Sequence, residues 1–310
     1  MRFSIFTPVF NRKDTLHRVW ESLSAQTCHD FEWIVIDDGS SDDPRPLLER
    51  YRADAPFPVT IEYFARNRGK HVAWNRAAAL AKGELFVVAD SDDAFVPESL
   101  AVFDREWQAI PANDRNAFAG ITVLCKDSRS GDVVGERFPT SPFDTNALDL
   151  AYIHRIGGEK WGCVRTDLTR AIPFPEVHGS HFAESYLWFQ LARTHRTRCV
   201  NEVLRVFYDD PRPDRLTQER RAAKPRESYE ASYVWNYCHL NMNGDYMRSR
   251  PREVVVTLVN LSRAALVLRR PFVEALRQLQ RSWHRLALVA LHPLALALYA
   301  RDIRRGRIAS

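Results

Sequence analysis

The chain has 310 residues, of which 45% are hydrophobic and 27% charged, with a formal net charge of +5. These proportions are ordinary for a globular protein and exclude a disordered or fibrous chain. Five cysteines, an odd number without a CxxC pair, favour reduced thiols in the cytoplasm over a disulfide framework. The N-terminus lacks a basic region followed by a long apolar stretch, so we expect no secretory signal.

The N-terminal part alternates short apolar runs with polar clusters. Strands are predicted at 3–6, 33–36, 59–64 and 85–89, and helical patterns follow at about 16–23 and over 72–82. This alternation predicts a doubly wound, mostly parallel α/β sheet. Each strand is followed by a polar cluster, and such sheets bind ligands at the carboxyl ends of their strands. We therefore expect the four clusters to line one crevice, at 7–12, 37–42, 67–71 and 90–93.

The cluster Asp90-Ser91-Asp92-Asp93 places three carboxylates in four positions directly after an apolar run. Like charges this close repel unless a metal or hydrogen bonds compensate them. A hard divalent cation such as Mg²⁺ binds one or two carboxylates together with the phosphates of a substrate. The alternative is an ordinary strand-to-helix turn with Asp as N-cap. The chain has no GxGxxG or GxxxxGK[ST] motif that would indicate a dinucleotide or P-loop site.

Four ordered motifs carry a resemblance to a known family. They are Thr7-Pro8-Val9-Phe10-Asn11-Arg12, then 35–42 with Asp37-Asp38-Gly39, then Asn67 with Gly69-Lys70-His71 and Asn75, and Gly83-Glu84 before Asp90-Ser91-Asp92-Asp93. Together they resemble bacterial family-2 inverting glycosyltransferases of the GT-A fold. The resemblance covers residues 1 to about 210. It implies a GT-A catalytic domain over 1–210, with a nucleotide-sugar half at 1–110 and an acceptor half at 111–210.

The resemblance also implies roles for single residues. Asp38 would hydrogen-bond the nucleotide base, and the wider nucleotide-binding set would be Thr7, Pro8, Phe10, Asn11, Asp38, Lys70, Asn75, Asp90 and Ser91. A Mg²⁺ or Mn²⁺ ion would be held by Asp92 and Asp90. Lys70 could neutralise a phosphate as a point charge or be a solvated loop lysine. Secondary candidates near the acceptor or the diphosphate are His71, Lys160, Trp161 and Asp93, although a buried Trp in a strand also explains Trp161.

The catalytic base is expected downstream, in the acceptor half. Residues 182–192 resemble the family's catalytic-helix segment, in which an acidic residue precedes an apolar helix, and Glu184 matches the base. Many members carry Asp here, so Glu is a departure. Gly158-Glu159-Lys160-Trp161 fits a subset of the family. The alternative is that Glu184 merely favours the positive end of its helix.

Charge divides the chain at about residue 210. Residues 211–310 contain 19 Arg or Lys and 8 Asp or Glu, a net charge of +11, whereas residues 1–210 carry −6. The segment Pro211-Arg212-Pro213-Asp214-Arg215 is typical of a domain boundary. Beyond it, helical patterns predict a basic helical C-terminal region, with helices at about 217–243, 252–269 and 272–304.

The last of these patterns contains an apolar run at 286–299. The run is too short for a membrane span and its apolar character is broken by His292-Pro293, so a span is not favoured. Arginines follow at once, which is typical of a helix lying in the interface of an anionic membrane. The alternative is a helix packed on its own domain or on a second subunit. We expect a cytoplasmic protein, peripheral at the inner face of the cell membrane.

Three functional classes remain. The leading one is an inverting, metal-dependent transfer of a sugar from a nucleoside-diphosphate sugar to the hydroxyl of a glycan or lipid-linked acceptor, in bacterial surface-glycan synthesis. A nucleotidyltransferase acting on sugar phosphates should show a Gly-rich loop near its N-terminus, but residues 7–12 contain no glycine. A nucleic-acid-binding protein is suggested by the pI of about 9.0. Its basic residues stand beside apolar helices without an aromatic stacking pattern, so we expect no nucleic acid partner.

Overall fold

The computed structural model describes residues 1–177, 182–209 and 225–308. The chain divides into two compact units. The first comprises Met1–Phe174 and Gln190–Asp210, and the second comprises Pro175–Phe189 and Pro211–Ser310. Residues 175–189, which we expected within the catalytic domain, therefore group with the second unit. The expected boundary segment 211–215 lies outside the described residues.

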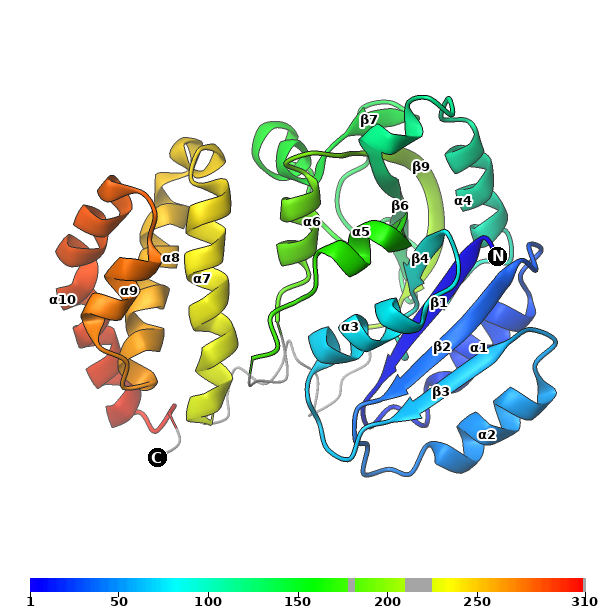
Figure 1. Cartoon of the computed structure of the whole chain (residues 1–310), viewed down its shortest axis with the longest axis horizontal. Coiled ribbons are helices and arrows are strands. Elements are labelled where there is room, and N and C mark those ends of the chain that lie inside the picture. Colours follow the sequence, from blue (N-terminus) through cyan, green and yellow to red (C-terminus); the bar gives the residue numbers. More distant parts are fainter. Residues whose placement is uncertain (178–181, 210–224, 309–310) are drawn as a thin grey trace. The chain divides into compact units, whose positions relative to one another are not determined.

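The first unit contains a nine-stranded sheet (Figure 1). Its first part is β3-β2-β1-β4, and these four strands are mutually parallel, as the sequence predicted. Their bounds are β1 Phe3–Val9, β2 Phe31–Asp37, β3 Val59–Tyr63 and β4 Leu85–Val88. This arrangement confirms the predicted α/β class.

The sheet continues from β4 through β8, β6, β9 and β5, and β7 pairs with β9. β8 is antiparallel to both of its neighbours, whereas β6 and β9 are parallel. β9 also pairs antiparallel with β5 and β7. The bounds are β5 Ala94–Phe95, β6 Phe118–Asp127, β7 Phe143–Thr145, β8 Lys160–Arg165 and β9 Arg196–Phe207.

Helices cover both faces of this sheet. Side chains of a strand alternate between its faces. Ile5 and Trp33 join one buried cluster with residues of α1, α2 and α4, whereas Phe6 contacts Trp74 of α3, with ring centroids 6.1 Å apart. Burial on both faces explains why the strands are continuous apolar runs. The unit's helical segments are α1 Leu16–Ser24, α2 Arg45–Asp54, α3 Lys70–Leu80, α4 Ser99–Gln108, η1 Arg115–Ala117, the π-helix η2 Asp149–His154 and α5 Thr166–Ala171. The division between the units falls within α6 Ser185–Leu191.

The second unit is helical, as predicted. Its segments are η4 Arg226–Ser228, α7 Tyr229–Asn243, η5 Tyr246–Ser249, α8 Pro251–Val267, α9 Phe272–Gln278 and α10 Ser282–Arg304. α8 packs against α7, α9 and α10. The single helix expected over 272–304 is wrong, because buried Leu279 adopts extended backbone and separates α9 from α10.

α10 continues through Pro293, within the helical pattern predicted over 272–304. A proline inside a helix removes one backbone hydrogen bond. Here contacts to α8 hold the helix on both sides of it. His292 Nδ1 lies 2.8 Å from Ser262 Oγ, and Asp302 forms an ion pair with Arg263 at 2.6 Å.

Candidate functional site

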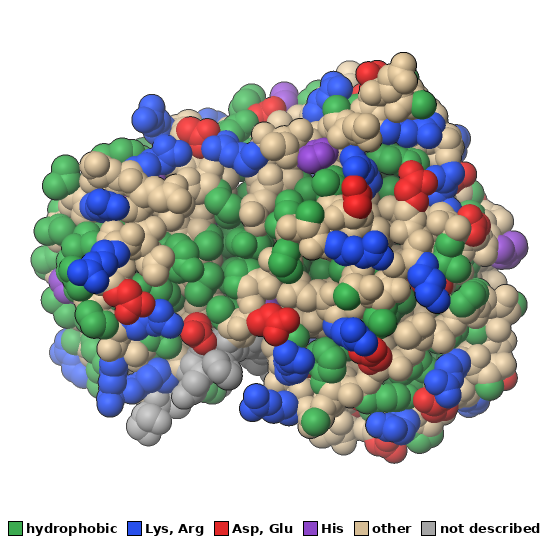
Figure 2. Space-filling view, in the orientation of Figure 1, with side chains coloured by type: hydrophobic (Ala, Val, Ile, Leu, Met, Phe, Trp, Pro, Cys, Tyr) green, Lys and Arg blue, Asp and Glu red, His purple; other side chains and the backbone are tan. Residues whose placement is uncertain are grey.

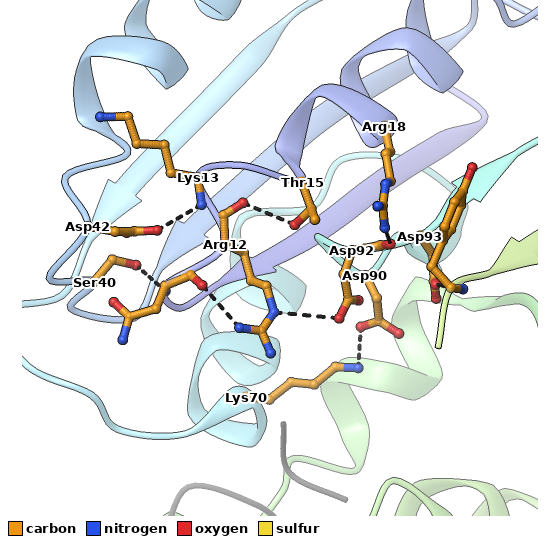
Figure 3. A network of polar contacts seen from close by, with 12 residues as sticks. Arg12, Lys13, Thr15, Arg18, Ser40, Asp42, Lys70, Asp90, Asp92 and Asp93 are labelled. Atoms are coloured by element: carbon orange, nitrogen blue, oxygen red, sulfur yellow. Dashed lines mark hydrogen bonds and ion pairs between the residues drawn. The ribbon is translucent and has the colours of Figure 1, made fainter. Parts of the chain in front are cut away.

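The loops that follow β1 and β2 are joined by side-chain hydrogen bonds (Figure 3). The backbone N–H of Asn11 donates to Ser40 Oγ at 3.0 Å, and Asn11 Oδ1 accepts from the N–H of Ser41 at 2.8 Å. Asn11 adopts a left-handed conformation with φ of 53°, which Asn tolerates better than most residues. Lys13 N–H donates to Asp42 at 2.9 Å. The two predicted clusters therefore form one edge of the sheet.

Asp38 fixes the third cluster onto this edge. Its two carboxylate oxygens accept the backbone N–H groups of Arg68 at 2.6 Å and Gly69 at 2.8 Å. Burial raises the pKa of Asp38 to about 6, although the two amides oppose this rise. Gly39 has a φ of +73°, and a Cβ there would lie 2.5 Å from the carbonyl carbon of Arg66. Glycine is therefore required where the two loops approach.

The fourth cluster, Asp90 to Asp93, is held by basic side chains from three other segments. Asp90 forms ion pairs with Lys70, the first residue of α3, and with Arg205 of β9 at 2.9 Å. Arg205 Nε also donates to Asp93 Oδ2 at 2.8 Å, and Asp93 Oδ1 accepts the N–H of Tyr208 at 3.0 Å. Asp92 lies 3.5 Å from Arg12 Nε (Figure 3).

The surroundings of Asp90 and Asp93 shift the pKa values of these two carboxyls in opposite directions. Burial would raise the pKa of Asp90, but Lys70 and Arg205 together hold it below its ordinary value. Asp93 is 4% exposed, and burial raises its pKa to about 6 because it outweighs the attraction of Arg205. The pKa of Arg205 is itself raised by Asp90 and Asp93, although burial opposes this. Asp93 and Arg205 thus form a buried inner pair.

Asp90 and Asp92 are the more accessible carboxylates, with side chains 23% and 29% exposed. In the part of the chain that the structure describes, no group of three or more His, Cys, Asp or Glu side chains is placed to hold a metal ion. Two carboxylates fit the chemistry of Mg²⁺ or Mn²⁺ only if other oxygens, such as substrate phosphates, complete the coordination. The donor set is therefore compatible with a cation that arrives with a phosphorylated ligand.

Three of the residues that we expected in the site make hydrogen bonds within the protein. Thr7 is fully buried, and its hydroxyl accepts a hydrogen bond from Trp33 Nε1 at 2.9 Å. Asn75 makes two 2.8 Å hydrogen bonds with the backbone of Phe174. Trp161 is 6% exposed and donates to the carbonyl of Val88 at 2.6 Å. These contacts account for the positions of the three side chains, and no bound ligand is needed to explain them.

The other expected residues differ in their accessibility. His71 of α3 and Ser91 are buried, Pro8 is partly buried, and Phe10 is 40% exposed beside Asn11. Lys160 Nζ donates to the carbonyl of Gly157 at 2.6 Å, and burial lowers the pKa of Lys160. Phe10 is therefore the expected binding residue that is most open to a ligand.

Glu184 stands directly before α6, in the segment that groups with the second unit. Its carbonyl accepts the N–H of Leu187 at 3.0 Å and so begins the helix. This position agrees with the predicted acidic residue at the start of a helix.

Sequence reasoning identified Lys70 but missed the arginines of this site. Arg12 was read only as part of a motif, and neither Arg18 nor Arg205 was assigned. Arg18 donates to the carbonyl of Asp92 at 2.7 Å and stacks over the ring of Tyr208 at 3.8 Å. The available signal was Arg205, a charged residue within the apolar strand 203–207, because a buried arginine requires an acidic partner.

Comparison with known proteins agrees with this geometry. Residues 4–157 match the family model described as Glycosyl transferase family 2. An uncharacterised glycosyltransferase of Haemophilus influenzae is 30% identical over 155 residues, which are 50% of each chain. Two relatives are each 35% identical over 102 residues. One is a poly(ribitol-phosphate) beta-glucosyltransferase of Bacillus spizizenii (32% of this chain, 16% of the relative), and the other an undecaprenyl-phosphate 4-deoxy-4-formamido-L-arabinose transferase of Pseudomonas syringae (31% and 30%).

The chain thus spans half or less of the length of these relatives. Two solved structures share its fold. S. aureus TarS 1–349 in complex with UDP-GlcNAc aligns with a TM-score of 0.64 and 17% identity over 99% of this chain and 93% of that one. The mannosyltransferase PcManGT from Pyrobaculum calidifontis, in complex with GDP-Man and Mn²⁺, gives 0.57 and 21% over 98% and 83%. The resemblance seen in the sequence is confirmed: through its N-terminal half, the chain belongs to glycosyl transferase family 2 and has the GT-A fold.

Proposed function

We propose that this protein transfers a sugar from a nucleoside-diphosphate sugar to an acceptor hydroxyl, with inversion, in the synthesis of a bacterial surface glycan. The observation that carries the proposal is the Asp90–Asp93 loop, which meets Arg12 and Lys70 at the carboxyl edge of a family-2 sheet. The solved neighbours in complex with UDP-GlcNAc and with GDP-Man support a nucleotide-sugar donor.

The donor nucleotide would occupy the edge formed by Pro8, Phe10, Asn11 and Asp38. A carboxylate has about four lone-pair sites, and the loop amides use two of those on Asp38. The remaining sites can accept from a nucleotide base. Phe10 follows Val9, whose carbonyl accepts the N–H of Asp38 at 2.8 Å, and its exposed ring offers an apolar surface at this edge.

A divalent cation, Mg²⁺ or Mn²⁺, would be held by Asp92 and Asp90, the more accessible carboxylates. Such a cation stabilises, as a Lewis acid, the charge on the leaving diphosphate. Lys70 pairs with Asp90 and Arg12 lies near Asp92, so both basic side chains can turn to the phosphates when the donor binds. The Mn²⁺ complex of the archaeal neighbour supports this assignment.

Glu184 would take the proton from the acceptor hydroxyl. A single in-line displacement needs one base near that hydroxyl and inverts the anomeric centre. The support is local, since Glu184 opens α6 as the family's base opens its helix. The acceptor would be a glycan or a lipid-linked sugar at the cytoplasmic face of the membrane, because the names of two relatives contain poly(ribitol-phosphate) and undecaprenyl-phosphate.

Donor and cation can be tested together by thermal unfolding with nucleotide sugars, with and without Mn²⁺. A ligand at about 100 times its Kd stabilises the native state by about 2.7 kcal/mol. Asp92→Asn should remove the Mn²⁺-dependent part and abolish turnover. The matched control is Asp144→Asn, because Asp144 is also 29% exposed and paired with an arginine. Turnover that is indifferent to both EDTA and Asp92→Asn would contradict the metal assignment.

The reaction class and the base need a separate assay. Glu184→Gln should lower transfer by roughly 10² to 10⁴ with little change in donor binding, whereas Glu176→Gln in the same segment should not. NMR of the product from an α-linked donor should show a β linkage. Release of pyrophosphate instead of nucleoside diphosphate would identify a nucleotidyltransferase and refute the proposal.

A further inference from the structure

We propose that the exposed face of α8 and α10 is a docking surface for an anionic lipid bilayer, on which the two helices lie without crossing it. The proposal deepens the membrane location given above and rests on it for its biological meaning. Its test requires no sugar transfer.

The first observation is a set of exposed apolar side chains on these two helices. Leu286 is 73% exposed and Val256 57% exposed. Figure 2 shows hydrophobic and basic side chains together over these helices. Soluble proteins rarely expose large apolar patches that serve no partner. The set on α8 and α10 consists of Val255, Val256, Trp283, Leu286, Val289, Leu294, Leu296 and Ile303.

The second observation is how little of α10 is used for packing. Only His284, Leu288, Ala295 and Asp302 are buried, and they form one stripe along the helix at spacings of four and seven. A helix in a globular protein usually buries a stripe at least about 100° wide. α10 is thus attached to α8 by a narrow seam, and its other apolar side is left for a partner.

A groove between the two helices gives this surface depth. It has a volume of about 520 Å³ and a largely apolar lining, with Arg248 as its charged residue. The lining residues include Met247, Val254, Leu258, Trp283, Ala287 and Leu291. An acyl chain fits such a lining, and Arg248 could then meet the phosphate of the same lipid. The groove continues the exposed apolar set, since Val255 and Trp283 belong to both.

Charge favours a bilayer over a second copy of the chain. Residues 271–308 contain seven arginines and two acids, and one of these acids, Asp302, is fully buried and paired with Arg263. In a twofold dimer the same patch meets itself, which would bring these arginines together. Anionic lipids attract each basic residue near the surface instead. The arginines flank the apolar run of α10 on both sides: Arg277, Arg281, Arg285, Arg301, Arg304, Arg305 and Arg307.

Contacts along α10 favour a helix that lies on the membrane rather than one that crosses it. Within the described residues, α10 is the one helix long and apolar enough to cross a membrane by length and composition. However, Asp302 is paired with Arg263 and His292 contacts Ser262, so the seam to α8 is partly polar. Crossing would either break these contacts or bury a charged pair in hydrocarbon, and both are unfavourable. A helix that lies flat keeps the seam and buries only its free side.

Co-sedimentation with vesicles tests the proposal. The full chain should bind vesicles of phosphatidylglycerol and phosphatidylcholine, and bind poorly to phosphatidylcholine alone. Leu286→Asp/Val289→Asp should lower the partition coefficient at least tenfold, or about 1.4 kcal/mol. Ile153→Asp, at a 63% exposed position of the first unit, is the matched control and should bind as the wild type does.

The charge contribution has its own variants. Arg304→Gln/Arg305→Gln should weaken binding by roughly tenfold or more, and added salt should reduce the difference from wild type. Arg52→Gln/Arg105→Gln, at exposed arginines of the first unit, should leave vesicle binding unchanged. Circular dichroism and nucleotide-sugar binding of each variant establish that the fold and donor site are intact. These readouts separate a failure of this proposal from a failure of the transfer function.

Three results would overturn the proposal. One is full-length protein that ignores anionic vesicles while remaining folded. Another is a dimer in solution that Leu286→Asp/Val289→Asp converts to monomer, because the face would then be an interface between copies. The third is vesicle-bound protein that resists an alkaline carbonate wash, since this would indicate a helix that spans the bilayer.

Discussion

Arg205 should stabilise the first unit by an amount that depends on the protonation of Asp93. Arg205 is 11% exposed, and its guanidinium contacts both Asp93 and Asp90. Arg205→Gln leaves Asp90 with Lys70, but Asp93 keeps only the Tyr208 amide among these contacts. Removing one partner of a buried pair typically destabilises by about 3–5 kcal/mol. We expect the lower end, about 3 kcal/mol at pH 7, because Asp93 can take up a proton instead of remaining an unpaired charge.

The loss should therefore be smaller at pH 5 than at pH 7. Burial already raises the pKa of Asp93 to about 6, so most of the carboxyl is protonated at pH 5 even in the wild type. A neutral Asp93 loses less when Arg205 is removed. For the same reason, Arg205→Gln/Asp93→Asn should be more stable at pH 7 than the sum of the two single variants, by about 0.5–3 kcal/mol of coupling.

Urea unfolding followed by tryptophan fluorescence at the two pH values measures these differences. Arg198→Gln is the control, because Arg198 is also 11% exposed and paired with an aspartate. Arg198 pairs with Asp144 of β7 and not with Asp93, so no coupling to Asp93→Asn is expected. A loss for Arg205→Gln that does not change with pH, and that simply adds to Asp93→Asn, would refute the inner pair.

Three further predictions concern the frame of the site. Gly39→Ala should destabilise more than Gly131→Ala and weaken nucleotide-sugar binding in calorimetry, because both glycines have φ near +75° but only Gly39 has backbone within 4 Å. Equal effects would show that the clash is relieved. Trp161→Phe should lose about 1–3 kcal/mol of stability, since the Val88 carbonyl loses its donor, while transfer by the folded fraction is unchanged. A specific loss of acceptor affinity would instead indicate that Trp161 belongs to the acceptor site. The pKa of Asp38 is raised to about 6 from an ordinary 3.8, so the native state binds more protons between about pH 4 and pH 6. Its contribution to the free energy of unfolding should therefore fall by about 3 kcal/mol as pH rises through this window, measured against Asp38→Asn. A difference that is constant with pH would refute the buried assignment.

The parallel half of the sheet was predictable because its signals are local. Apolar runs such as 33–36 and 85–89 encode strands buried on both faces, and each run is followed by a polar cluster. The order of the clusters along the chain then places them at one edge. No long-range contact has to be known for this step, so the sequence was sufficient for this half of the sheet and for the position of the Asp90–Asp93 loop.

The partners inside the site were not predictable in this way. Arg205 is 112 residues from Asp93, and the pairing of β9 that brings it there is not encoded in a local pattern. Asn75 likewise meets Phe174 across 99 residues. A motif specifies which residue types recur, but it does not separate a side chain that binds a ligand from one that supports the loop beside it. Local patterns also missed the break between α9 and α10, where buried Leu279 adopts extended backbone.

The carboxylate loop divides into two layers with different chemistry. Asp93 and Arg205 are nearly inaccessible and hold β9 to the loop, so substituting either should affect stability first. Asp90 and Asp92 are more exposed, and their basic partners Lys70 and Arg12 come from the neighbouring loops that border the proposed donor site. A diphosphate that binds there would attract the basic side chains of Lys70 and Arg12 away from the two carboxylates. A divalent cation would then compensate the charge of Asp90 and Asp92. The exchange keeps every charge paired, which is why a loop without a preformed metal cluster remains suited to a metal-assisted transfer.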